Sequence, residues 1–296
     1  MLQRLLYSPF LAQVVVTRRC NLACSYCNEF DKVSSPVPGD VLLRRLEHLK
    51  RLGVFAVELT GGEPLLHPDL GDLVAHARGL GFLKVMMISN AFLMDERRIE
   101  ELNAAGLHEV QISVDGVEPT SRTVKVLRHL GPKLETMSRL ARFRIVLSAV
   151  LGSASTAEAR EVIAFAGAHG MAARVLALHG ADGQFRLEDG ERQAYLDISR
   201  ALGHRFREAH DYRTRLLSGR PAPFKCRAGS RYLYVAEDGM VHWCSQTRAD
   251  FAVPLEDYDQ ATLREQFHTP KRCSVHCTMG CARTSSAPDR WRPQHP

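Results

Sequence analysis

Three cysteines close to the start of the chain have the residue type and the spacing of a metal or redox site. They are Cys20, Cys24 and Cys27, in the run Cys-Asn-Leu-Ala-Cys-Ser-Tyr-Cys. One loop of this length can wrap a single inorganic cluster, because three thiolates satisfy three irons of a cubane [4Fe–4S] cluster and leave the fourth iron open. Zinc is the alternative. A structural zinc site takes four ligands, so Asp31 or a distant histidine would have to supply the fourth.

A second motif, Thr-Gly-Gly-Glu-Pro at residues 60–64, closes an apolar run. Paired glycines allow backbone to approach a ligand closely, and Glu63 would present a carboxylate to a cation at the end of a strand. Taken alone, the motif is also compatible with a tight turn that carries a solvated glutamate.

Five further cysteines lie in the last quarter of the chain: Cys226, Cys244, Cys273, Cys277 and Cys281. Residues 231–236 alternate like a strand, and the Asp-Gly pair at 238–239 favours a hairpin turn. Such a hairpin would bring Cys226 and Cys244 close together. The other three thiols would lie roughly along one face if residues 273–281 were helical, but a loop is equally compatible. A zinc ribbon is the alternative for this tail.

Six short apolar runs predict strands that could position these motifs. They are residues 11–17, 54–60, 83–89, 109–114, 143–150 and 174–179. The intervals leave room for one helix each, so the pattern predicts an α/β fold with a parallel sheet, either an incomplete barrel or an open doubly wound sheet. In such folds the chemistry gathers at the carboxyl ends of the strands. Polar residues at those ends are Glu63, Asn90, Asp115 and His179.

Local signals mark two of the helices and one boundary. Asp40 is predicted to cap a helix that stops at Gly53, and a capping box at residues 155–158 is predicted to start a helix that ends near Gly170. Residues 188–218 look helical and charged, and a Pro-rich linker follows them. We therefore expect a barrel domain over residues 1–220 and a small cysteine-rich module over residues 221–296.

Composition excludes several classes of protein. The chain has 296 residues, of which 45% are hydrophobic and 24% charged, an ordinary globular ratio. Its net charge of +6 is spread thinly, so we expect no nucleic-acid partner. The sequence shows neither a long apolar run nor a signal peptide, so we expect no membrane partner. Clustered thiols without a signal peptide indicate a reducing, cytoplasmic compartment.

Taken together, the three-cysteine loop with an aromatic residue before its last cysteine and the Gly-Gly-Glu-Pro element resemble the radical S-adenosylmethionine (SAM) enzymes. The resemblance covers roughly residues 14–180 and implies a partial (β/α)6 barrel. It implies that Cys20, Cys24 and Cys27 bind a [4Fe–4S] cluster whose open iron is chelated by SAM. It also implies a set of SAM contacts: Tyr26, Gly62, Glu63, Ser89, Asn90, Ser113 and Asp115.

The resemblance gives these contacts different roles. Gly62 and Glu63 would meet the amino group of SAM, and Tyr26 would pack by the adenine. Residues 88–90 match the strand-end segment that contacts the methionyl carboxylate or the ribose of SAM. Ser113 and Asp115 lie in the next such segment and are candidate contacts for cofactor or substrate.

The tail resembles the auxiliary-cluster modules called SPASM and Twitch. The resemblance rests on Cys226, on Gly239 five residues before Cys244, and on the cysteines that follow. A full SPASM module has seven cysteines for two clusters, whereas this tail has five, which implies the Twitch-like version with one auxiliary [4Fe–4S] cluster. One of Cys273, Cys277 and Cys281 would then be spare, or one iron would be left open for substrate.

The chemistry implied by the resemblance is reductive cleavage of SAM to a 5′-deoxyadenosyl radical, which takes a hydrogen atom from a C–H bond. A flavodoxin- or ferredoxin-type protein would donate the electron. Only about ten residues precede the first predicted strand, which favours a small metabolite as substrate over a peptide or protein. A radical peptide or protein maturase is the alternative, and an iron–sulfur binding or redox-sensing protein is a third hypothesis. Arg122, Lys125 and His179 are candidate contacts for an anionic substrate.

Overall fold

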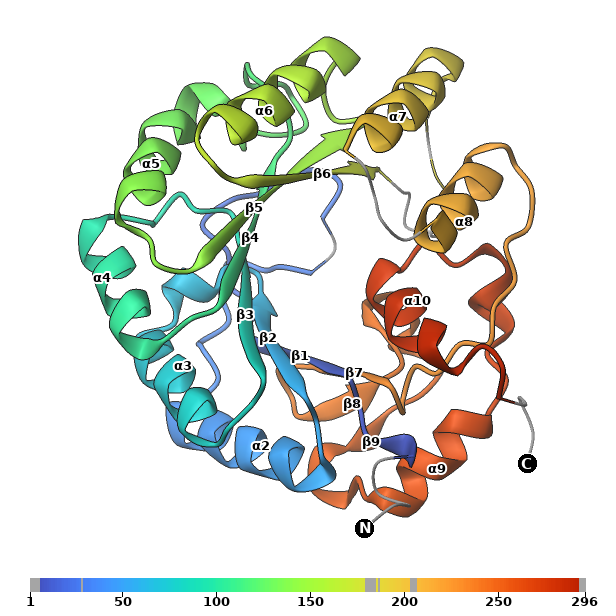
Figure 1. The fold of residues 1–296 in the computed structure, drawn as a ribbon. Helices are drawn as coiled ribbons and strands as arrows, with labels where there is room; N and C mark the ends of the chain where they lie inside the picture. The colour runs from blue at the N-terminus through green and yellow to red at the C-terminus, as the bar shows by residue number, and fades with distance from the viewer. Residues whose placement is uncertain (1–5, 28, 179–184, 186, 203–206, 293–296) are drawn as a thin grey trace.

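A single curved sheet organises the chain. The computed structural model describes residues 6–27, 29–178, 185, 187–202 and 207–292. Within them, six strands pair in parallel: β1 (Leu11–Thr17), β2 (Ala56–Gly61), β3 (Lys84–Ser89), β4 (Glu109–Val114), β5 (Arg144–Leu151) and β6 (Ala172–Ala177). The sheet is open and curved, with helices on its outer face (Figure 1), and this confirms the partial-barrel prediction.

One helix follows each of the first five strands and crosses the outside of the sheet. These helices are α2 (Gly39–Leu52), α3 (Leu70–Gly79), α4 (Glu96–Ala105), α5 (Leu127–Leu140) and α6 (Thr156–Ala168). The alternation along β1 shows how the sheet separates its two faces. Ala12, Val14 and Val16 belong to the core shared with the helices, whereas Gln13 and Val15 face the inside of the barrel.

The strand predictions are confirmed for β1 and β4, whose bounds agree, and the other four differ by one or two residues at one or both ends. The predicted cap at Asp40 is wrong. Helix α2 begins at Gly39 because the amides of Val41 and Leu42 both donate to the carbonyl oxygen of Pro38, and Asp40 instead pairs with Arg44 at 2.8 Å.

The other local predictions hold. Gly53 ends α2 with a left-handed backbone at φ +87°. Ser155 and Glu158 form the capping box of α6, and Gly170, at φ +67°, follows the end of that helix.

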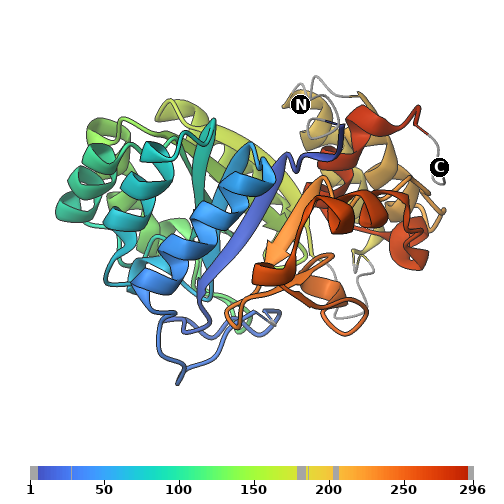
Figure 2. The same cartoon turned by 90° about the horizontal axis from the view of Figure 1, so that it is seen from below.

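The C-terminal hairpin joins the same sheet. Strand β7 (Tyr232–Val235) pairs in parallel with β1, with Tyr232 opposite Leu11, and β8 (Met240–His242) and β9 (Val253–Pro254) continue it antiparallel. Gly239, at φ +89°, lies in the predicted turn. Figure 2 shows the C-terminal segment beside β1. The two predicted parts therefore share one hydrogen-bonded sheet, and the boundary near residue 220 stays a prediction.

Further helices occupy the gap between β6 and β7. Helix α7 (Asp189–Ala201) contacts β6, and α8 (Arg207–Leu217) contacts both α7 and α10 (Gly280–Ser286), which in turn contacts β7 (Figure 1). Helix α9 (Gln260–His268) lies near the N-terminal end of the described chain. In the described part of the chain, every helix is too short or too polar to cross a membrane.

We predict that Glu158→Gln weakens the start of α6 in a pH-dependent way. The carboxylate accepts hydrogen bonds from Ser155 and from the amides of Val117 and Glu118, at 2.8–3.1 Å. These bonds hold the pKa of Glu158 below its usual value, although burial opposes them. Their contribution to the unfolding free energy is therefore fully present above the pKa that Glu158 has in the unfolded chain. It is lost as the pH falls through the lower pKa that Glu158 has in the folded protein.

The measurement is urea unfolding of the apoprotein at pH 7.5 and at pH 4. We expect the variant to lose about 1 kcal/mol of unfolding free energy at pH 7.5 and less at pH 4. Glu161→Gln, at an exposed position of the same helix, is the control and should change little at either pH. An equal loss at both pH values would contradict the role assigned to the ionised carboxylate.

Candidate functional site

The first cysteine group lies on a loop that closes back on itself after β1. The amide of Cys20 donates to the carbonyl oxygen of Asp31 at 3.1 Å, and the amide of Asp31 donates to that of Arg18 at 2.8 Å. Lys32 Nζ donates to the carbonyl oxygens of Cys20 and Leu22 at 3.0 and 2.7 Å. These bonds hold the cysteines beyond the carboxyl end of β1.

The three thiols are unpaired and differ in exposure. Cys24 is buried, Cys20 is half-buried and Cys27 is exposed. Burial raises the pKa of Cys20, and the neighbouring Glu63 and Cys27 raise it further. In the part of the chain that the structure describes, no three Cys, His, Asp or Glu side chains converge closely enough to hold a single metal ion. Three free thiols on one loop nevertheless form the donor set that suits a cluster with one open iron.

The glycine pair of the second motif serves a close approach within the chain itself. The amide of Gly62 donates to the carbonyl oxygen of Thr17 at 2.8 Å, and the next amide donates to that of Arg19 at 2.9 Å. A Cβ atom on Gly62 would lie 2.3 and 2.4 Å from the carbonyl oxygens of Arg18 and Arg19, and one on Gly61 would lie 2.1 Å from that of Thr17. Only glycine fits at these positions, so the pair fixes the start of the cysteine loop against the end of β2.

Glu63 is fully buried, so the alternative of a tight turn that carries a solvated glutamate is wrong. The carboxylate accepts hydrogen bonds from the amide of Leu65 (3.0 Å), from Ser89 Oγ (2.8 Å) and from the amide of Asn90 (2.7 Å). Burial raises its pKa, although these three bonds oppose the shift. Glu63 thereby ties the end of β2 to the end of β3. Its predicted contact with SAM stays a prediction.

Asn90 connects β3 to the cysteine loop. Its Nδ2 donates to Cys20 Sγ at 3.7 Å and to Asn21 Oδ1 at 2.8 Å. The next residue, Ala91, has φ +59° and is the one non-glycine residue with positive φ in the described ranges. The turn at the end of β3 is therefore strained, and it points the Asn90 amide at the first cysteine. The sequence singled out Ser89 and Asn90, and the structure brings both to this loop.

Tyr26 and Asp115 form a second connection, between the cysteine loop and the end of β4. The Tyr26 hydroxyl donates to Asp115 Oδ2, as does Thr123 Oγ1 at 2.6 Å, and Lys125 Nζ lies 3.5 Å from the same oxygen. Burial and the Asp115 carboxylate raise the pKa of Tyr26 well above its ordinary value. Asp115 is fully buried, and within the described ranges its Oδ1 has no hydrogen-bond partner. An unsatisfied buried acceptor beside the cysteine loop is a position where a ligand donor would be favoured.

The residues considered for an anionic substrate are otherwise engaged. Lys125 pairs with Asp115 and lies 5.0 Å from the centre of the Tyr26 ring, and Arg122 donates to the carbonyl oxygen of Gly152 at 2.6 Å. His179 lies outside the described residues.

Ser113 lies opposite Ser148 in the pairing of β4 with β5 and is half-buried. Sequence reasoning missed Thr123, a loop residue that only the fold brings to Asp115.

The β7–β8 hairpin brings the buried pair Cys226 and Cys244 close together, as the sequence predicted. Burial raises the pKa of Cys226 to about 11, and Cys273 and Cys244 contribute to that rise. Burial likewise raises the pKa of Cys277 to about 12, with contributions from Cys226 and Cys244. Cys226 and Cys244 therefore lie within electrostatic reach of each other and of both Cys273 and Cys277.

Cys281 has different neighbours. Its thiol accepts a hydrogen bond from Gln13 Nε2 of β1 at 3.7 Å. Burial raises its pKa to about 12, and the strongest charges acting on it belong to Glu58, Arg174 and Arg213 rather than to other cysteines. Cys281 is the second residue of α10, and its contact with Gln13 places it toward the inside of the barrel, whereas Cys273 lies in a preceding 3-10 turn.

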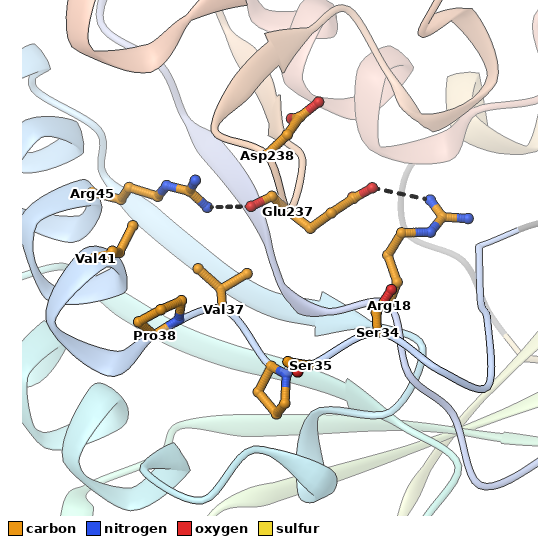
Figure 3. Close-up of a pocket in the computed structure, with 10 residues that line it drawn as sticks. Arg18, Ser34, Ser35, Val37, Pro38, Val41, Arg45, Glu237 and Asp238 are labelled. Atoms are coloured by element: carbon orange, nitrogen blue, oxygen red, sulfur yellow. Dashed lines mark hydrogen bonds and ion pairs between the residues drawn. The ribbon is translucent and has the colours of Figure 1, made fainter.

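Charged residues bridge the two cysteine groups. Glu237, in the hairpin turn, lies 3.6 Å from Arg18 at the start of the cysteine loop and 3.3 Å from Arg248. Arg248 also lies 3.1 Å from Glu29, two residues after Cys27. Figure 3 shows a pocket of about 360 Å³ beside this bridge, with Arg45 donating to the backbone of Glu237.

A family model and several curated proteins match part of the chain. Residues 14–151 match the family model of the radical SAM superfamily. The PqqA peptide cyclase of Bradyrhizobium diazoefficiens is 39% identical over 113 residues, which are 37% of this chain and 30% of that protein. The PqqA peptide cyclase of Xanthomonas oryzae pv. oryzae is 34% identical over 156 residues, 48% of this chain and 40% of that protein. The chain thus matches less than half of the length of these relatives.

Solved structures share the fold at low identity. SuiB of Streptococcus suis bound to its precursor peptide SuiA superposes with a TM-score of 0.67 at 15% identity, over 90% of this chain and 66% of that one. The structure of anSMEcpe with AdoMet and the Cp18Cys peptide gives a TM-score of 0.61 at 16% identity, over 88% of this chain and 82% of that one. At these identities the comparison supports the fold alone.

We predict that Gly62→Ala disrupts the cysteine loop. The added Cβ would meet two backbone oxygens that cannot move without opening the loop. We expect the apoprotein to lose about 2 kcal/mol of unfolding free energy and the reconstituted protein to retain less iron. Gly167→Ala, in α6 with no atom within 4 Å of the new Cβ, is the control and should keep wild-type stability and iron. Wild-type behaviour of Gly62→Ala would refute the close approach described above.

Proposed function

This chain belongs to the radical SAM superfamily through residues 14–151, and we propose that its substrate is a peptide. The observation that carries the proposal is the 34–39% identity to PqqA peptide cyclases over 113–156 residues of this chain. The fold is also shared with SuiB, which was solved with a precursor peptide, and with a protein solved with a bound peptide. Because the match covers less than half of the curated relatives, their complete activity is not transferred to this chain.

This proposal replaces the small-metabolite substrate that the sequence favoured. That preference rested on the short segment before β1, which says nothing about how a peptide would bind elsewhere. The relatives favour the peptide instead. An iron–sulfur binding or redox-sensing role is the outcome to expect if the protein does not cleave SAM.

The chain's residues fit the cofactor set of the superfamily. We propose that Cys20, Cys24 and Cys27 hold the [4Fe–4S] cluster, and that Asn90 orients Cys20 through its hydrogen bond to the thiol. Cluster and SAM together, when bound, supply a 5′-deoxyadenosyl radical. The free Oδ1 of Asp115 is positioned to accept a hydrogen bond from a ligand that lies against Tyr26.

Four of the five C-terminal cysteines form the proposed auxiliary site. Cys226 and Cys244 lie within electrostatic reach of each other and of both Cys273 and Cys277, and we assign these four to one auxiliary [4Fe–4S] cluster. Cys281 is the spare thiol of this assignment. The electron that starts the reaction would come from a flavodoxin- or ferredoxin-type protein.

The activity test is formation of 5′-deoxyadenosine from SAM by the reconstituted, dithionite-reduced protein. We expect the wild type to form the nucleoside and Cys24→Ala to form none, because the N-terminal site then lacks one of its three thiolates. Cys281→Ala is the matched control and should retain activity. Cleavage by Cys24→Ala would show that the N-terminal site is wrongly assigned, and no cleavage by a wild type with full clusters would favour a binding or sensing role.

The iron content tests the division of the cysteines. We expect about eight iron atoms in the wild type and in Cys281→Ala, and about four in a Cys226→Ala/Cys244→Ala double variant. The double variant keeps all three thiols of the N-terminal loop, so its remaining iron should still respond to SAM. A wild type that saturates at four irons, or a large loss of iron in Cys281→Ala, would refute the assignment.

A further inference from the structure

Two arginines lie near the open edge of the barrel and α10, and among the described residues neither has a carboxylate partner. They are Arg174 on β6 and Arg213 on α8. In the described part of the chain, neither forms an ion pair within 4.0 Å. They lie close enough to affect each other, since Arg213 is among the charges that act on Arg174. Two half-buried guanidinium groups that repel one another cost folding free energy unless an anion lies near them.

Arg174 faces the inside of the barrel. Its neighbour Val175 packs into the core with the helices, so Arg174 points to the opposite face of β6. Its Nε donates to Ser148 Oγ at 2.8 Å, and its two Nη atoms have no hydrogen-bond partner among the described residues. The side chain is thus fixed at one nitrogen and presents the other two toward the barrel interior.

Arg213 is held from the other side by tyrosines. Its Nε donates to Tyr212 OH at 2.9 Å and its Nη1 to Tyr195 OH at 3.1 Å. Its Nη2 lies 3.3 Å from where a Cβ on Gly280 would be, directly beside Cys281. Because both arginines also act electrostatically on Cys281, all three side chains border the same region.

Glu58 is the nearby carboxylate that could neutralise this region, but it is engaged elsewhere. It is buried opposite Gln13 in the pairing of β1 with β2, and Gln13 Nε2 donates to its Oε2 at 2.5 Å. It contributes charge at a distance rather than an ion pair. Glu109 also acts on Arg174 at a distance, but its carboxylate pairs with Lys84 and Arg144.

We propose that Arg174 and Arg213 form a subsite that binds a carboxylate of the substrate inside the barrel. Free Nη atoms of arginine match the two oxygens of a carboxylate. Arg174 lies three residues before the end of β6, so an anchored carboxylate leaves the rest of the substrate directed toward the carboxyl ends of the strands and the cysteine loop. The identification of the substrate as a peptide rests on the proposed function. The carboxylate of that peptide belongs either to an acidic side chain or to the C-terminus.

The charge of the subsite can be measured without knowing the substrate, because Cys281 is the spare thiol. The reconstituted holoprotein is treated separately with iodoacetate and with iodoacetamide, and modification of Cys281 is quantified by mass spectrometry. The two reagents differ in charge but react with the same thiolate, so their rate ratio reports the local potential. We expect Arg174→Gln or Arg213→Gln to lower the iodoacetate-to-iodoacetamide ratio about fivefold.

Two variants serve as controls for this measurement. Arg174→Lys keeps the charge and should retain most of the ratio. Arg200→Gln removes an exposed arginine of α7 that pairs with Asp197, and should leave the ratio unchanged. An unchanged ratio in both Gln variants would overturn the proposal. Failure of both reagents to reach Cys281 would also overturn it, because the region would then not admit even a two-carbon carboxylate.

The source of the carboxylate is tested with three pools of N-acetylated pentapeptides. One pool has a central Glu and an amidated end, one a central Gln and an amidated end, and one a central Gln and a free C-terminal carboxylate. We expect the wild-type holoprotein with SAM to bind one of the two carboxylate-bearing pools more tightly than the neutral pool. Arg174→Gln should lose this preference. Equal retention of all pools, or retention of none, would overturn the subsite. Failure of the proposed function would appear separately, as absence of SAM cleavage.

Discussion

The close backbone approach between the end of β1 and the end of β2 is the constraint on which the site depends. The Gly61–Gly62 pair lies against the carbonyl oxygens of residues 17–19 at distances that exclude any side chain. This contact fixes where the cysteine loop leaves the sheet. The loop is then connected to the next strands in turn, to β3 through Asn90 and to β4 through Tyr26 and Asp115. The carboxyl ends of four strands thus determine the position of one loop.

The parallel pairing of β7 with β1 places the second cysteine group on the same sheet. Because β1 carries the first group at its end and is flanked by β7, neither group can move far relative to the other without breaking strand hydrogen bonds. The charged bridge from Arg18 through Glu237 and Arg248 to Glu29 reinforces this arrangement. Helices α8 and α10 cover the open side of the barrel and bring Arg213 and Cys281 to its interior.

Features encoded locally could be predicted from the sequence, and features made by long-range packing could not. Apolar runs predicted the strands, and Ser155 and Glu158 predicted the cap of α6. Strands and caps were predictable because each depends on residues only a few positions apart. The glycine pair predicted a close approach to a ligand, but the atoms it approaches in the structure are backbone oxygens about 45 residues earlier, which the sequence could not show. The pairing of β7 with β1 joins segments more than 200 residues apart through a four-residue strand. Arg174 looked like an ordinary strand residue, and only the fold shows that it has no carboxylate partner among the described residues.

Electron paramagnetic resonance of the dithionite-reduced holoprotein, with and without SAM, tests most directly the central claim that one sheet carries two distinct cluster sites. The account predicts signals from two reduced [4Fe–4S] clusters, of which SAM changes one and leaves the other unaltered, because only the three-cysteine loop leaves an iron open. A single cluster signal, or two signals that SAM leaves unchanged, would contradict the claim of two distinct cluster sites.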